Sequence, residues 1–176
     1  MPLNTTYAEQ EAGFAGMLYG TGPKQVESFV QGEASAEVPF GAVVAQGTAG
    51  SAGTPDKAIL MVDANSVPVG VLIHSHAYNR ETQLGTTGVK PTNVIDVMRK
   101  GRIYALFEGS VTKGNNAFIR HTAGVGGSQK GALRADADTA SAVVCRGISF
   151  AETKSGGGYV LVNVDMDNVA AVSGLT

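Results

Sequence analysis

The sequence contains no tryptophan and only one cysteine, and just 16% of its residues are charged. A lone cysteine, Cys145, cannot close a disulfide within the chain, so the folded state must be stabilised by packing or by assembly. The formal net charge of −2 excludes a strong positive field, on which affinity for the nucleic acid backbone chiefly depends. We therefore expect no nucleic acid partner.

Long apolar runs are also absent from the sequence. Nowhere do about 18 apolar residues follow one another, as a membrane-spanning helix would require. The N-terminus lacks the basic segment and apolar core that a secretory signal requires. We therefore expect no membrane association, and we expect the chain to be made in a cytoplasm.

Glycine is abundant, with 24 glycines among 176 residues, and this number predicts many turns. From Pro39 onward, short apolar runs rich in β-branched residues alternate with glycine-bearing turns, which is typical of strands in a sandwich or barrel. The sequence therefore predicts an all-β fold, a small β-barrel or β-sandwich over residues 39–176 with an extended N-terminal arm. Strands are predicted near 40–46, 58–62, 68–75, 93–99, 102–107, 117–121, 143–150 and 158–165.

A hairpin is predicted within residues 93–107. The pair Lys100-Gly101 separates two apolar runs there, and glycine readily supplies the positive φ that tight hairpin turns require. A further Gly- and Asn-bearing turn at 112–116 precedes the run 117–121. These three strands are expected to form a meander.

Residues 1–38 differ from the rest of the chain because glycines interrupt every window in which a helix could propagate. The segment is nevertheless too apolar for a solvated linker, so it needs a surface on which to lie. We predict that residues 1–38 form a docking arm that binds a partner protein and becomes ordered upon docking. The predicted partner-binding side chains are Phe14, Met17, Leu18, Tyr19, Val26 and Phe29.

Two histidines, His74 and His76, are spaced so that both side chains would lie on one face of a strand, where they could hold a transition metal. A third ligand such as His121 or Asp63 would have to come from elsewhere in the chain, and nothing in the spacing indicates that it does. The alternative is that both are polar residues at the end of a strand. We expect no metal and no other cofactor.

Motifs for catalysis are incomplete. The glycine-rich run 124–131 lacks the Gly-Lys-Ser/Thr order of a phosphate-binding loop. Cys145 lies within an apolar run, where burial makes a thiol inert. The carboxylate pairs Asp136 with Asp138 and Asp165 with Asp167 are interpreted as solvated charges. We expect that the protein is not an enzyme.

Several segments, taken in a constant order, resemble the structural cement proteins of tailed bacteriophages. The similarity extends from about residue 7 to the final predicted strand, and it is weakest at 48–66 and 135–156. The segments that carry it are 12–17 (AGFAGM), 21–23 (TGP), 33–41 (EASAEVPFG), 43–47 (VVAQG), 70–78 (GVLIHSHAY), 83–91 (QLGTTGVKP), 97–104 (VMRKGRIY) and 126–132 (GGSQKGA).

The resemblance implies a capsid decoration protein, made in a bacterial host, that sits on the outer surface of a phage head. It implies that the major capsid protein is the partner and that neighbouring capsid subunits are bridged. It implies no catalytic residues. Because shell axes present repeated sites, we expect a homo-oligomer, a trimer or a dimer. The alternatives are a tail or fibre module of the virion and a small-ligand or sugar-binding β-barrel.

Overall fold

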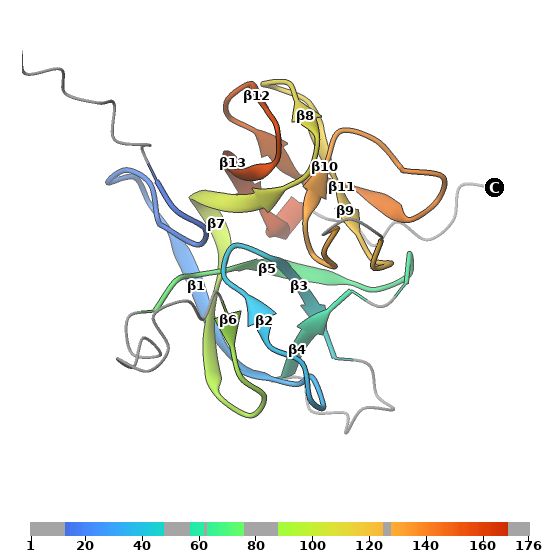
Figure 1. The fold of residues 1–176 in the computed structure, drawn as a ribbon. Helices are drawn as coiled ribbons and strands as arrows, with labels where there is room; N and C mark the ends of the chain where they lie inside the picture. The colour runs from blue at the N-terminus through green and yellow to red at the C-terminus, as the bar shows by residue number, and fades with distance from the viewer. Residues whose placement is uncertain (1–12, 48–56, 62, 76–87, 125–127, 169–176) are drawn as a thin grey trace, which may run out of the picture.

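The computed structural model of the chain describes residues 13–47, 57–61, 63–75, 88–124 and 128–168. The regular secondary structure of these residues is almost entirely β-strand (Figure 1), so the prediction of an all-β fold is confirmed. Helical structure in these ranges is confined to one 3-10 turn, η3 (Met166–Asn168). Among the described residues, no helix has the length and apolarity needed to cross a bilayer.

Most of the strands belong to one nine-stranded sheet, and two short strand pairs flank it. The sheet contains β1 (Gln25–Gln31), β3 (Val43–Gln46), β4 (Lys57–Leu60), β5 (Pro68–Leu72), β7 (Val94–Phe107), β9 (Asn116–Arg120), β10 (Leu133–Arg134), β11 (Ala142–Phe150) and β13 (Gly158–Asp165). The short pairs are β2 (Val38–Pro39) with β6 (Gly88–Val89), and β8 (Ser110–Val111) with β12 (Lys154–Ser155).

Strand pairing closes the sheet into two rings that share β7. The first barrel consists of β1, β4, β3, β5 and the N-terminal half of β7, because β1 pairs with both β4 and β7. The second barrel consists of β10, β9, β11, β13 and the C-terminal half of β7, because β13 pairs with both β11 and β7. In Figure 1 the first barrel occupies the lower half of the view and the second barrel the upper half. Closure removes the free edges that an open sheet would expose.

β7 runs straight through the position of the predicted hairpin, so that prediction is wrong. Lys100 pairs with Gln25 of β1 and with Asp165 of β13, and Gly101 continues the ladder opposite Val164. Gly101 has a φ of 133°, which bends the strand without reversing it. The predicted meander is wrong as well, because β10 lies between β7 and β9 in the sheet. The prediction for 158–165 coincides with β13.

Two apolar clusters fill the molecule and join the barrels. Ile95 and Val97 of β7 lie in the cluster of the first barrel, and Ile103 lies in that of the second. The second cluster also includes Val71 and Met98, which come from the strands of the first barrel. Side chains of adjacent strand residues point to opposite faces, so the outer face of the first barrel packs against the second barrel.

The structure corrects the boundary of the predicted arm. Residues of β1 pair with β7 from Gln25 to Val30, which makes β1 an integral strand of the first barrel. Phe29 of this strand is 5% exposed and packs in the core, and Val38 of β2 is fully buried. The physical reason is that the first barrel needs β1 to close its ring, a long-range pairing that the local glycine pattern does not reveal. Residues 13–24 precede this barrel and contain no strand of the main sheet.

Candidate functional site

Residues 13–19 lie along β7 and are held there by backbone hydrogen bonds. The N–H of Gly16 donates to the carbonyl of Tyr104 at 2.7 Å, and the N–H of Tyr104 donates to the carbonyl of Met17 at 3.0 Å. On the other side, the N–H of His74 donates to the carbonyl of Gly16 at 2.9 Å. An isolated bridge pairs Leu18 with Ile103. The described part of the segment therefore docks on the chain's own barrels, which differs from the expectation that it becomes ordered only on a partner.

Glycine at position 16 is what permits this close approach. Gly16 has a φ of 79°, in the left-handed region that side chains disfavour. A Cβ atom at this position would lie 2.5 Å from the backbone nitrogen of His74, too close for any side chain. The segment and β5 therefore approach each other at a distance that only glycine tolerates.

The docked segment completes a row of ring side chains that we call the aromatic strip. Phe14 contacts His74 edge-on at a centroid distance of 4.8 Å, and Phe40 contacts the other side of His74 at 4.5 Å. Tyr104 lies between Tyr19 at 6.0 Å and Tyr159 at 6.3 Å, both edge-on. These are favourable geometries for aromatic pairs. The aromatic strip consists of Phe14, Tyr19, Phe40, His74, Tyr104 and Tyr159.

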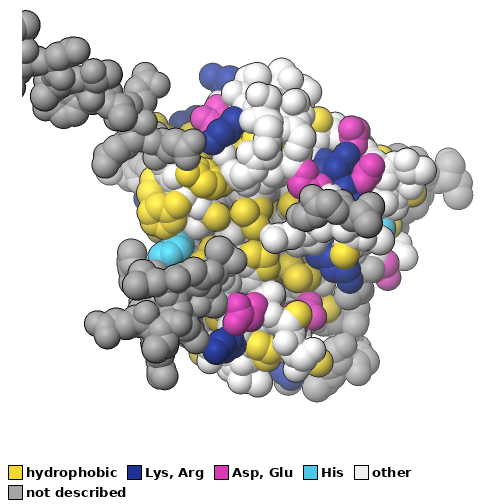
Figure 2. All heavy atoms as spheres, in the orientation of Figure 1, with side chains coloured by type: hydrophobic (Ala, Val, Ile, Leu, Met, Phe, Trp, Pro, Cys, Tyr) yellow, Lys and Arg dark blue, Asp and Glu magenta, His cyan; other side chains and the backbone are white. Residues whose placement is uncertain are grey.

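The outer members of the strip expose apolar surface to solvent. Phe14 is 42% exposed, Tyr19 is 41% exposed and the neighbouring Leu18 is 38% exposed. Figure 2 shows hydrophobic side chains gathered on this face beside a histidine. The ring of buried Tyr104 packs against Tyr19. Burial of Tyr104, together with Glu152 and Tyr19, raises the pKa of the Tyr104 hydroxyl. Rigid, partly exposed rings of this kind are typical anchors of protein interfaces.

A cationic hollow adjoins Tyr19 at the end of the strip. Its volume is about 340 Å³, and Lys24 and Arg102 line it together with Tyr19 and glycines of the 20–24 turn. Arg102 donates to the side-chain oxygen of Asn163 at 2.9 Å, which fixes the guanidinium beside β13. The arrangement suits a partner surface that places an acidic side chain next to an apolar one.

The predicted partner-binding residues divide into three groups. Phe14, Leu18 and Tyr19 project from the docked segment, and Met17 is half-buried within it. Val26 is exposed on β1 but belongs to the first barrel, where it pairs with Met98. Phe29 is in the core, so the prediction that it is available to a partner is wrong.

The remaining rings of the aromatic strip were not predicted from the sequence. Phe40, His74, Tyr104 and Tyr159 come from four separate segments of the chain. Only the fold brings them together, and no local spacing marks them. For the half-buried His74, the sequence indicates either a metal ligand or a polar residue at a strand end, and neither interpretation includes contacts with Phe14 and Phe40.

The histidines are not gathered into a metal site in the part of the chain that the structure describes. His76 lies outside the described residues. His121 is buried next to Thr122, whose hydroxyl lies 3.0 Å from Nδ1, and the carboxylate of Asp63 accepts hydrogen bonds within its own turn. No group of three histidine, cysteine, aspartate or glutamate side chains is placed to hold an ion among these residues.

The lone cysteine and the distal carboxylates have structural surroundings. Cys145 is buried as predicted, and its burial raises the pKa of the thiol. Asp165 lies 3.6 Å from Lys100, and Asp167 lies 3.9 Å from Arg99, so both carboxylates form ion pairs at the surface. Of the glycine-rich run 124–131, residues 125–127 lie outside the described residues.

Two arginines and three carboxylates form an ion cluster at one end of the second barrel. Arg120 contacts Glu108 at 2.8 Å and also pairs with Asp138, while Arg134 contacts Glu108 and Asp136 at 3.0 Å each. Burial alone would lower the pKa of Arg120, but its hydrogen bonds with Glu108 and Asp138 outweigh that effect and raise it. The arginine cluster consists of Glu108, Arg120, Arg134, Asp136 and Asp138, so the sequence-based interpretation of Asp136 and Asp138 as simply solvated charges is wrong.

Comparison with known proteins gives two findings. The family model described as structural cement protein (E217 gp24/Pam3 gp6) matches residues 3–165. A solved chain from a structure titled "The capsid of Myoviridae Phage XM1" has the same fold, with a TM-score of 0.67 at 14% identity. The match covers 94% of this chain and 98% of that chain. A search of curated proteins found no match.

The family model covers nearly the whole of the chain, including the docked N-terminal segment and both barrels. This match is the evidence for the family. The similarity to the solved capsid chain supports the same fold independently. The chain therefore belongs to the phage structural cement protein family.

Proposed function

We propose that this protein binds the outer surface of a phage head through the aromatic strip and bridges neighbouring major capsid subunits. The observation that carries the proposal is the exposure of Phe14, Leu18 and Tyr19 from a segment that the chain's own barrels hold in place. Anchors that are ordered before binding lose little conformational entropy when they dock. Family membership supports a shell subunit as the partner.

Bridging stabilises a shell because its binding free energy favours the assembled subunits over the separated ones. A protein that binds several subunits at once adds binding free energy that must be lost before those subunits separate. The apolar strip and the adjoining cationic hollow offer both a desolvated contact and a charged rim, as specific interfaces usually do. We propose that this role is structural and involves no catalysis.

The packing of the described residues favours this role over a ligand-binding barrel. Buried apolar side chains of the described residues pack inside both barrels, as in a structural module. We still predict a homo-oligomer, either a trimer or a dimer. Light scattering of the purified protein measures its oligomeric state in solution.

Co-sedimentation with expanded shells that lack the protein tests the proposal. We expect the wild-type protein to bind and to raise the temperature at which the shells disrupt. The double variant Phe14→Ser, Tyr19→Ser should bind about 30-fold more weakly, because loss of aromatic anchors typically costs about 2 kcal/mol.

The matched control is Val67→Ser. Val67 is 50% exposed and precedes β5, at the opposite end of that strand from His74. This variant should bind like the wild type. Equal binding by the strip variant and the control would refute the strip as the docking surface, and absence of wild-type binding would refute the function.

A further inference from the structure

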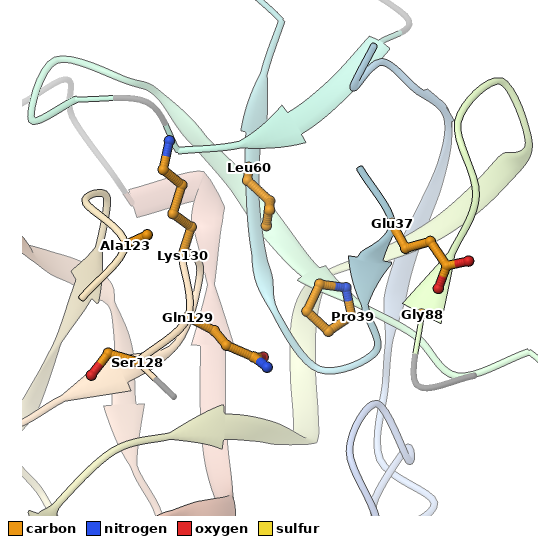
Figure 3. A pocket seen from close by; sticks show the side chains of 8 residues that line it. All are labelled: Glu37, Pro39, Leu60, Gly88, Ala123, Ser128, Gln129 and Lys130. Carbon is orange, nitrogen blue, oxygen red and sulfur yellow. The ribbon is translucent and has the colours of Figure 1, made fainter. Parts of the chain in front are cut away.

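A groove of about 340 Å³ lies between the two barrels and is lined by residues that do not belong to the aromatic strip (Figure 3). Pro39 of β2, Leu60 of β4 and Gly88 of β6 line it from the first barrel. Gln129 and Lys130, from the connection between β9 and β10, line it from the second barrel. The groove therefore exists only because β7 holds the two barrels side by side.

Both walls of the groove are fixed by contacts behind them. A Cβ atom at Gly88 would lie 2.5 Å from the carbonyl oxygen of Val38, so β6 packs directly on β2. The N–H of Gln129 donates to Glu108 at 2.8 Å, which ties the opposite wall to the arginine cluster. A site whose walls are formed before binding spends little free energy on reorganisation.

Charges of opposite sign stand on the two sides of an apolar floor. Figure 3 shows Glu37 on one side, Lys130 on the other, and Leu60 and Pro39 between them. Among the described residues, neither Glu37 nor Lys130 has an ion-pair or hydrogen-bond partner for its side chain. Lys130 is half-buried and lines the groove. The groove is thus complementary to an occupant that carries both charges in the opposite order.

The shape of the groove favours a short extended segment over a folded element. Its volume is at the lower end of the range of about 300 to 1,000 Å³ that is typical of ligand sites. Pro39 has no N–H to donate, so an occupant cannot extend β2 by regular backbone pairing at this residue. Recognition at Pro39 must therefore depend on side chains, and in an extended chain every second side chain points the same way.

We propose that this groove binds an extended segment of a shell subunit with the pattern basic, x, apolar, x, acidic. The basic side chain pairs with Glu37, the apolar one covers Leu60 and Pro39, and the acidic one pairs with Lys130. This inference rests on the proposed function, because it takes the shell subunit as the partner. It gives the protein a second contact, made by residues other than those of the aromatic strip, and two contacts on different subunits are what bridging requires.

Charge-reversed variants test the groove in the same shell-binding assay. Lys130→Glu and Glu37→Lys should each lower the affinity for shells about tenfold, because each places like charges together. The matched control is Lys113→Glu, an exposed lysine in the turn between β8 and β9. Thermal unfolding of each variant verifies that it is folded. Zero-length carbodiimide cross-linking of the wild-type complex should couple Lys130 to an acidic residue and Glu37 to a lysine of one segment of the shell subunit.

The outcomes separate the groove from the function. If the wild type binds shells and both groove variants bind as tightly as Lys113→Glu, the groove is not a contact, while the proposed function stands. Cross-links from Lys130 and Glu37 to distant segments of the shell subunit would also overturn the inference. If the wild type does not bind shells at all, the proposed function itself fails.

Discussion

At the scale of single residues, Arg120 has a structural role that its sequence context does not indicate. It is 3% exposed, and its guanidinium pairs with Glu108 and Asp138 from two other segments. Asp138 begins a turn in which three successive residues other than glycine have positive φ, namely 44°, 52° and 69° at Asp138, Thr139 and Ala140. Left-handed residues cost about 1 to 2 kcal/mol each. The arginine cluster therefore holds a turn that would not form alone.

Replacement of Arg120 by alanine should lower the free energy of unfolding by about 3 kcal/mol, because it leaves partly buried carboxylates without their partner. Urea unfolding measures the change. Arg146→Ala is the control, since Arg146 is exposed on β11 and its loss should change stability by less than about 0.5 kcal/mol. Equal effects of the two substitutions would show that the cluster contributes no stability.

The same cluster predicts a dependence on acid. A hydrogen bond from Arg134 holds the pKa of Asp136 below its usual value of 3.8. The unfolded chain therefore binds a proton at a higher pH than the folded chain, so this stabilisation is complete above about pH 4 and is lost as the pH falls through the lower native pKa.

The free energy of unfolding should consequently fall as the pH drops below about 4, and Asp136→Asn should make this fall shallower. Urea unfolding at a series of pH values provides the measurement. An unchanged slope in the variant would mean that Asp136 is not among the groups responsible.

At the scale of elements, the segment 13–19 depends on glycine for its place against β7. Gly16 and Gly20 offer a matched comparison, since their φ values are 79° and 72°. A Cβ atom at Gly16 would meet the backbone of His74 at 2.5 Å, whereas a Cβ atom at Gly20 would meet nothing within 4 Å. The two positions share the same strain and differ only in the contact.

Gly16→Ala should release the segment from β7, while Gly20→Ala should cost only about 1 kcal/mol of left-handed strain. Hydrogen exchange at the Tyr104 amide reports the release, because this N–H donates to the carbonyl of Met17. We expect faster exchange and weaker shell binding for Gly16→Ala alone. Similar exchange in both variants would contradict the docking described here.

At the scale of the whole molecule, two closed rings share one strand and one continuous packing. The sequence predicts an arm over residues 1–38 that is separate from the barrel, but β1 closes the first ring by pairing with β7. Deletion of residues 1–24 should therefore leave a folded protein with weak shell binding. Deletion of residues 1–31 should abolish cooperative unfolding, because it opens the ring and removes Phe29 from the core.

Calorimetry distinguishes the two truncations. A sharp thermal transition for the shorter deletion and none for the longer one is the expected result. A wild-type transition after deletion of residues 1–31 would show that the first barrel does not need β1. It would also support the boundary that the sequence predicts between an arm, 1–38, and a barrel domain, 39–176.

The sequence by itself determined the fold class, the position of most strands and the family. Alternating valines at 160, 162 and 164 were sufficient to place β13, because a strand with one buried face shows an alternating apolar pattern in its own sequence. The exposed apolar residues of the docked segment, Phe14, Leu18 and Tyr19, could also be identified from the sequence, since a run too apolar for solvent must contact a surface.

The tertiary structure alone decided that β7 continues through Gly101, that β1 belongs to the first barrel, and which rings join Phe14 and Tyr19. A glycine with positive φ is compatible with a turn or with a bend, and its strand partners, which come from distant parts of the chain, select between them. The groove with Glu37 and Lys130 has the same origin, because two segments some 90 residues apart line it. Local patterns specify faces of strands, whereas long-range pairing specifies which faces meet.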